Sequence, residues 1–278
     1  MSAAEPGEIA GSLADPFFYT SPNTARVNVA MDLPVTEIKT EKVKGKLHAE
    51  MHVLGIAYRA DGKAAARFSD TMKLDFNDKK ELDAFTKQPL HYENEFAVAA
   101  GSYTLKLAFS LGHKFGKLET PLVVEPWDGK HLSMSGVAFS NSVHRLDQAD
   151  GLDAELLQGR TPLVAQGVEI VPAATHRSKK AELSVLYVEV YEPSLEEPNP
   201  PQVRLQLRLF DRKTGQVALD RGTFSVASAV RAGNPVIPVA VRLPLDSLAP
   251  GSYRAELRAT DSKGRQTTLR ATDFDLEP

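Results

Sequence analysis

The sequence predicts an all-β protein built from two related β-sandwiches, with one short helix in the first. Three observations predict this fold class: short segments alternate polar and apolar residues, phrases of the first half recur in the second, and each half carries a similar turn before a tyrosine. The chain has 278 residues, 42% of them hydrophobic, which is enough for two cores. We expect residues 1–16 to be a flexible tail, residues 17–127 the first sandwich and residues 128–278 the second.

Alternation is clearest at the start of the first half. Arg26–Asp32 alternates polar and apolar residues, and in Leu47–Val53 the polar residues His48, Glu50 and His52 separate the apolar ones. The pair Asp61-Gly62 is typical of a hairpin turn. Further strands of this half are expected at residues 63–76, 92–98, 102–109 and 118–124.

One segment of the first half has a helical pattern. Asp78–Thr86 places Leu82 and Phe85 three residues apart, on one face of a helix. Asn77 or Asp78 could cap its first turn. We therefore expect a short helix between two strands of the first sandwich.

The second half repeats this pattern of strands and turns. Val203–Phe210 alternates without interruption, and its strand is turned back at Lys213–Gly215. Residues 192–201 and 234–238 are rich in proline, which favours loops that bridge strands or protect a sheet edge over partner-docking segments. Other strands are expected at residues 133–139, 167–171, 186–191, 236–243, 252–260 and 267–274.

An internal repeat relates the two halves. Gly101–Leu107 is similar to Gly251–Leu257, and the turn at Asp61-Gly62 is similar to the one at Thr214-Gly215. Gly116-Lys117 and Gly264-Arg265 are expected to close the last hairpin of each copy. Three matches at nearly one offset indicate two copies of one domain.

The repeated turn also indicates the kind of sandwich. Leu248–Tyr253 resembles the tyrosine corner of immunoglobulin-like domains, in which a tyrosine hydroxyl bonds back to the preceding corner. Gly101 and Tyr103 repeat the spacing of Gly251 and Tyr253. The predicted fold is therefore a tandem of immunoglobulin/fibronectin-III-like β-sandwiches, with these four residues as structural corners.

Composition and missing motifs argue against common enzyme classes. The chain has no cysteine, so disulfides, thiolate metal sites and cysteine nucleophiles are excluded. We find no nucleophile elbow, phosphate-binding loop, dinucleotide fingerprint or zinc-protease motif.

Charge and hydropathy bear on the possible partners. A net charge of −3 provides no global field for nucleic acid, and no apolar run is long enough for a membrane helix. We expect no enzyme activity, no cofactor, no nucleic-acid partner and no direct membrane insertion.

The alternating histidines are a candidate metal site. His48, Glu50 and His52 would share one face of a strand, where neighbours two apart can ligate one ion. The two histidines lie ~13 Å apart along a strand, which is too far for one ion to join both easily. The polar face of an amphipathic strand is the favoured interpretation.

An acidic loop is the second metal candidate. Asp147, Asp150 and Asp153 cluster around Gly151, and calcium favours several oxygens on such a loop. Their spacing differs from that of an EF-hand. A solvated loop with a helix cap at Asp153 is the favoured interpretation.

Trp127 is the chain's single tryptophan. An exposed tryptophan could stack on a sugar, but a large apolar side chain is more often packed. A carbohydrate-binding accessory module stays an alternative function. It would require a row of exposed aromatic residues on one sheet face.

Several phrases resemble one protein family. Phe18–Val29, Gly55–Gly62, Arg160–Gly167 and Asn234–Val239 resemble the region C-terminal to the von Willebrand factor A-like domain of acidobacterial VWFA-related proteins, and the resemblance extends from about Phe17 to the end. It implies a periplasmic or extracellular setting. The family's A-like domain carries a D-x-S-x-S metal site, which this chain lacks, so that site is not carried over. This suggests that Met1 begins a fragment or a shortened relative, although residues 1–16 have no features of a signal peptide.

The predicted function is that of a structural, assembly or protein-interaction module of the cell envelope or extracellular space. Its partner would be another protein or further copies of itself, because sandwiches present sheet edges and end loops as binding surfaces. The alternatives are a carbohydrate-binding module and a metal-dependent enzyme using His48, Glu50 and His52.

Overall fold

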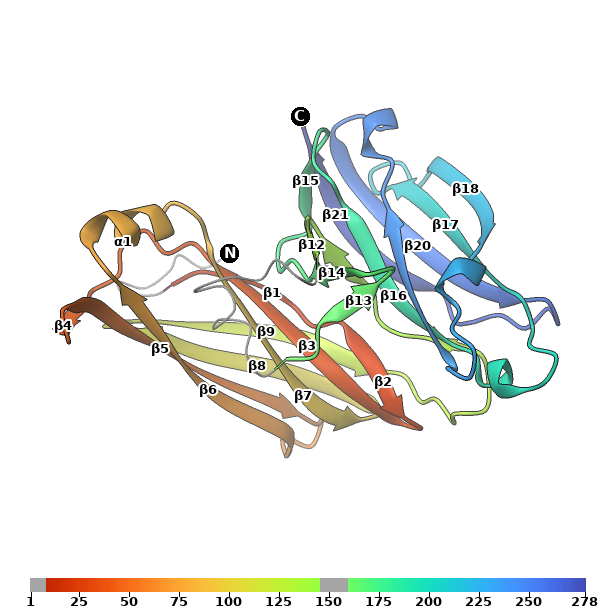
Figure 1. The fold of residues 1–278 in the computed structure, drawn as a ribbon, viewed down its shortest axis with the longest axis horizontal. Helices are drawn as coiled ribbons and strands as arrows, with labels where there is room; N and C mark the ends of the chain where they lie inside the picture. Colours follow the sequence, from red (N-terminus) through yellow and green to blue (C-terminus); the bar gives the residue numbers. More distant parts are fainter. Residues whose placement is uncertain (1–8, 146–159) are drawn as a thin grey trace. The chain divides into compact units, whose positions relative to one another are not determined.

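The computed structural model describes residues 9–145 and 160–278, and strands dominate it (Figure 1). Within this part there is one α-helix, α1 (Lys79–Phe85), and three short 3-10 turns. None of the described helices has the length and apolar character needed to span a bilayer. The described residues form two compact units, one with residues 9–15, 26–125 and 160, the other with residues 16–25, 126–145 and 161–278.

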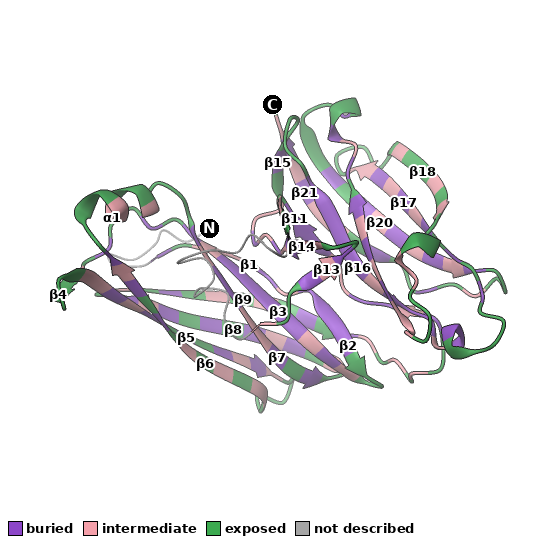
Figure 2. Ribbon diagram, in the orientation of Figure 1, coloured by how far each residue is buried: buried purple, intermediate pink, exposed green. Residues whose placement is uncertain are grey.

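The first unit is a sandwich of two sheets. In one sheet β3 pairs with β1 and with β7, and the other has the strand order β6-β5-β8-β9, with β4 beside the start of β5. The bounds are β1 (Ser12–Ala14), β3 (Thr24–Leu33), β4 (Glu41–Val43), β5 (Lys46–Tyr58), β6 (Ala64–Phe76), β7 (Leu90–Ala99), β8 (Gly101–Leu111) and β9 (Lys114–Val124). Alternate residues such as Met51, Val53 and Leu105 are buried between the sheets because successive side chains of a strand point to opposite faces. Figure 2 shows this alternation as bands of buried and less buried colour along the strands.

The second unit repeats this topology. The strand order β18-β17-β20-β21 corresponds to β6-β5-β8-β9, and β16 pairs with β19 as β3 pairs with β7. The bounds are β16 (Val185–Tyr191), β17 (Val203–Asp211), β18 (Val217–Ser225), β19 (Val236–Arg242), β20 (Gly251–Asp261) and β21 (Arg270–Glu277). The predicted fold class, a tandem of immunoglobulin/fibronectin-III-like sandwiches with one short helix in the first, is confirmed.

Shorter strands complete the second unit. β15 runs parallel to β21 at one sheet edge, β10 and β11 pair with β16, and β12, β14 and β13 form a small third sheet. The remaining strand, β2, carries three buried aromatic residues of this unit. Their bounds are β2 (Phe17–Ser21), β10 (Ser133–Met134), β11 (Ala138–Ser140), β12 (Ser142–Arg145), β13 (Leu163–Ala165), β14 (Val168–Val171) and β15 (Arg177–Lys179).

Residues 9–15, which lie within the expected flexible tail, are held by strand pairing and burial. β1 pairs with β3, with Leu13 opposite Met31, and Ile9 is buried and donates its backbone N–H to the Phe115 carbonyl. A few apolar side chains are enough to order a short strand where the edge of another strand is available for pairing. Such long-range pairing leaves no alternation of polar and apolar residues in the sequence of the short strand itself. Residues 16–25 are part of the second compact unit.

One of the predicted hairpin turns is misplaced. Gly264, with φ +81°, lies in the turn between β20 and β21 as expected, but the β8–β9 turn is made at Gly112, with φ +60°. Gly116 lies inside β9, opposite Phe109, whose ring and the Ile9 carbonyl fill the space that a Cβ would need. Gly116 is therefore a site of close packing rather than of chain reversal.

Candidate functional site

His48, Glu50 and His52 share the solvent-facing side of β5, as the alternation predicts. The His48 Nδ1–H donates to Asp75 Oδ1 at 2.6 Å, while the Nε2 atoms of His48 and His52 lie 3.5 and 3.6 Å from the two oxygens of Glu50. The hydrogen bond to Asp75 is the main reason that the pKa of His48 is raised. These residues form a row of charge pairs, and among the described residues no group of three or more such side chains could hold a metal ion. The metal-dependent alternative for this row stays untested.

The other metal candidates, Asp147, Asp150 and Asp153, lie outside the described residues.

The two tyrosine corners have matching geometry. The Tyr103 hydroxyl donates to the Ala99 carbonyl at 2.9 Å, and the Tyr253 hydroxyl donates to the Ala249 carbonyl at 2.7 Å. In each unit the bonded carbonyl lies in the corner before the tyrosine strand, where the chain crosses between sheets. Gly101 and Gly251 each begin their strand, two residues before the tyrosine.

Trp127 is half-buried in an aromatic cluster of the second unit. Its ring centroid lies 5.2 Å from that of Tyr19 and 5.0 Å from that of Tyr191, and its indole N–H donates to the His131 carbonyl at 2.8 Å. The tryptophan thus packs against two tyrosines instead of presenting an open platform for a sugar.

A buried charged cluster lies in the first unit. The His91 Nδ1–H and Nε2–H face Asp32 and Glu93 at 2.7 and 3.2 Å, and Arg160 lies 3.5 Å from the same Glu93 oxygen. Burial alone would lower the pKa of His91, but the two carboxylates outweigh it and raise the pKa to about 9. The imidazolium is held on both nitrogens, which suits a structural role better than proton transfer.

A second buried cluster ties together three chain segments of the second unit. Glu192, just after β16, and Asp261, at the end of β20, are both buried. Arg265 bridges them, with Nε 2.5 Å from Asp261 Oδ2 and a terminal nitrogen 2.9 Å from Glu192 Oε2. Its hydrogen bonds are used within the fold, so we assign it a stabilising role.

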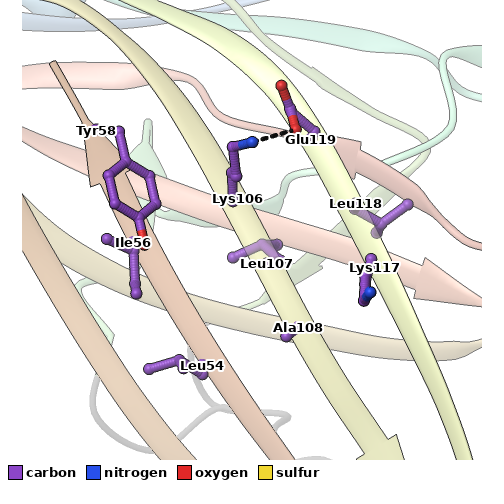
Figure 3. A pocket seen from close by; sticks show the side chains of 9 residues that line it. All are labelled: Leu54, Ile56, Tyr58, Lys106, Leu107, Ala108, Lys117, Leu118 and Glu119. Carbon is purple, nitrogen blue, oxygen red and sulfur yellow. Dashed lines mark ion pairs between the residues drawn. The ribbon is translucent and has the colours of Figure 1, made fainter. Parts of the chain in front are cut away.

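A groove on the first unit is the remaining candidate, and its residues were not singled out from the sequence. It encloses 390 Å³ on the outer face of β5, β8 and β9 (Figure 3). Lys106 and Glu119 form an ion pair at 2.9 Å along it. The groove is lined by Leu54, Ile56, Tyr58, Lys106, Leu107, Ala108, Lys117, Leu118 and Glu119.

A sequence signal for this groove existed. The polar side of β5 holds His48, Glu50 and His52, but the same alternation continues with Leu54, Ile56 and Tyr58. From that point the strand is apolar on both faces. Such a strand either is covered on both sides or exposes an apolar face, and here Leu54 is 43% exposed.

Comparisons with known proteins give no family. No family model and no curated protein matches the chain. Among solved structures, the fibronectin(III)-like modules of CbhA from Clostridium thermocellum are 11% identical, with 91% of this chain and 85% of that chain covered and a TM-score of 0.23. BcpA, the major pilin subunit of Bacillus cereus, is 12% identical over 96% of this chain and 67% of its own, with a TM-score of 0.22. Likeness at this level adds no argument to the fold already derived from strand pairing.

Proposed function

We propose that this protein is a non-enzymatic tandem β-sandwich module that works by binding another protein or by assembling with itself. The observation that carries the proposal is the open groove on β5, β8 and β9 of the first unit, where the apolar side chain of Leu54 is 43% exposed. Exposed apolar surface rimmed by polar residues often marks a site of contact with another protein.

The chemistry-bearing residues also support a binding role. The side chains of the candidate row on β5 contact one another, and the buried clusters around His91 and Arg265 use their hydrogen bonds within the fold. The tyrosine corner at Tyr103 stabilises the unit that carries the groove.

We further propose a periplasmic or extracellular location. Its support is the resemblance to the region after the A-like domain of VWFA-related proteins, stated above from the sequence phrases. Fractionation of the cells that produce the protein tests this directly. Recovery in the cytoplasmic fraction alone would contradict it.

Native purification tests the binding function. The wild-type chain is recovered from its own cells in parallel with a variant that carries Leu54→Ser and Ile56→Thr. For both we measure the molar ratio of any co-purifying protein to the chain, and the mass of the assembly by sedimentation. We expect a stoichiometric partner, or a higher assembly, with the wild type and its loss with the variant. Specific turnover of a substrate by the purified chain, or a wild type that stays monomeric and without a partner, would contradict the proposal.

A further inference from the structure

Exposed apolar side chains concentrate on one face of the first unit. The described residues include seven large hydrophobic side chains that are exposed. The strand registers place four of these seven on the outer face of the β6-β5-β8-β9 sheet and of β4 beside it. These four are Val43, Leu54, Phe115 and Val123.

The second unit shows that the fold does not require this face. Its equivalent strands present charged side chains outward, with Arg208 3.4 Å from Asp220 and Arg254 2.8 Å from Asp273. The strand order is the same in both units. Both outer faces carry charged contacts, and the first unit's face adds the apolar groove formed by Leu54, Ile56 and Ala108.

A short side chain makes the hollow in this face. Ala108 on β8 lies directly between Leu54 on β5 and Lys117 on β9 in the strand registers. Lys106, two residues along β8, is paired with Glu119 and limits the hollow on that side (Figure 3). The groove is open to solvent, so it fits a protruding side chain of a partner better than an enclosed small molecule.

The charges around the hollow are mainly positive. Lys106 and Glu119 neutralise each other, whereas Lys117 on β9 and Arg67 on β6, opposite Ile56, are exposed and make no ion pair within the described part of the chain. A second copy docked by two-fold symmetry would bring the positive charges around its own hollow against the same charges of the first copy. Carboxylates of a different partner would instead complement them, and such complementarity governs specificity and association rate.

We propose that this face binds an acidic polypeptide segment. An aliphatic or aromatic side chain of the segment inserts above Ala108, and flanking carboxylates lie against Lys117 and Arg67. The inference rests on the proposed binding function, whose partner class and contact surface it specifies.

Peptide binding to the full chain tests this inference. The probe is a fluorescein-labelled peptide with a Leu-Phe pair between glutamates, and the two reference peptides replace the pair by Ser-Ser or the glutamates by lysines. Fluorescence anisotropy should show binding of the first peptide, with clearly weaker binding of both references. Added salt should weaken the binding, because exposed charges are screened.

Variants locate the site. Ala108→Glu fills the hollow and adds a carboxylate, and we expect at least ~10-fold weaker binding, which corresponds to about 1.4 kcal/mol. Lys117→Glu should weaken binding about 3- to 10-fold. The matched controls are Val217→Thr, an exposed apolar residue of the second unit, and Lys213→Glu, in a turn of the same unit. Both controls should stay within about twofold of the wild type, because neither lies on the proposed binding face and isolated exposed charges outside it contribute little.

Several results would overturn the inference. They are equal binding of the three peptides, no binding of the acidic peptide, an unchanged affinity of Ala108→Glu, or a wild-type dimer that Ala108→Glu converts to a monomer. The mutated side chains are exposed, so an unchanged melting temperature confirms that each variant is folded. The native partner could be lost with the Leu54 and Ile56 variant while the acidic peptide does not compete with that partner for the wild-type chain. This result would overturn the inference and leave the proposed function standing.

Discussion

Replacing Arg265 by leucine should destabilise the second sandwich strongly. The guanidinium holds two buried carboxylates, Asp261 at 2.5 Å and Glu192 at 2.9 Å. Leucine keeps much of the apolar bulk but removes the charge and the hydrogen bonds. Both carboxylates would then stay buried without their cation.

The magnitude follows from the burial of this cluster. Removing one partner of a buried ion pair costs ~3–5 kcal/mol because the remaining charge is left uncompensated. The Arg265 side chain is 33% exposed, so water can partly replace it and we expect about 3 kcal/mol. For a unit of this size each kcal/mol lowers the melting temperature by about 2–4 °C, so the unit should melt ~6–12 °C lower.

The variant should also reduce the pH dependence of stability that Asp261 contributes. Burial would raise the pKa of Asp261, but the Arg265 side chain and the backbone N–H groups of Arg265 and Lys263 outweigh it, and the pKa is lowered. In the wild type its contribution is present above the unfolded pKa of ~3.9 and is lost as pH falls through the lower folded value. Arg265→Leu removes the side-chain hydrogen bond and the charge but keeps the two backbone hydrogen bonds, so the pKa of Asp261 should rise. The loss of stability should therefore be larger at pH 7 than at pH 3, where Asp261 is largely protonated in the unfolded chain.

Urea unfolding followed by circular dichroism at these two pH values measures both effects. Lys263→Leu is the matched control, since its ammonium lies 3.5 Å from Glu197 with both side chains about half exposed, and such pairs contribute ~0.2–1 kcal/mol. If Arg265→Leu loses no more stability than Lys263→Leu, or loses the same amount at both pH values, the reasoning about this cluster is refuted.

Three further predictions concern the other sites. Tyr103→Phe and Tyr253→Phe should each cost ~0.5–1.5 kcal/mol in urea unfolding, because each removes one corner hydrogen bond; effects near zero in both would deny the corners a structural role. The folded pKa of His91 is about 9, so its contribution to the free energy of unfolding should be complete below pH ~6.5. That contribution, up to ~3 kcal/mol, should be lost as the pH rises through 9. His91→Gln should remove this pH dependence, and an unchanged pH profile of stability in the variant would contradict the prediction. Zinc chloride should leave the melting temperature unchanged, because His48 and His52 face a shared carboxylate and do not converge on one point; a clear rise would show a site that binds the folded state.

Local signals in the sequence were sufficient to predict most of the framework. The alternation in Leu47–Val53 and Val203–Phe210 predicted β5 and β17 because each strand has one face in the core. The helix was predicted with its cap, since Asp78 accepts the Glu81 backbone N–H at 2.9 Å. The repeated corner at Tyr253 predicted the sandwich type because its hydrogen bond spans only four residues.

Features set by distant contacts were not predictable in the same way. β1 is ordered by pairing with β3, and Phe18 in the run Phe17–Tyr19 packs on Tyr187, far along the chain. The groove depends on strand register, because the short side chain of Ala108 leaves a hollow only where the longer Leu54 and Lys117 lie on either side of it. Neither register could be read from one strand alone.

Site-specific photo-crosslinking in the cells that produce the protein tests the central claim most directly. A photoreactive amino acid replaces Leu54 on the apolar face or, as control, Val217, which is similarly exposed on the second unit. Attachment of an acidic protein partner from position 54 and not from position 217 is the expected result. Equal labelling from both positions, attachment of a second copy of the chain, or no product from position 54 would contradict the account.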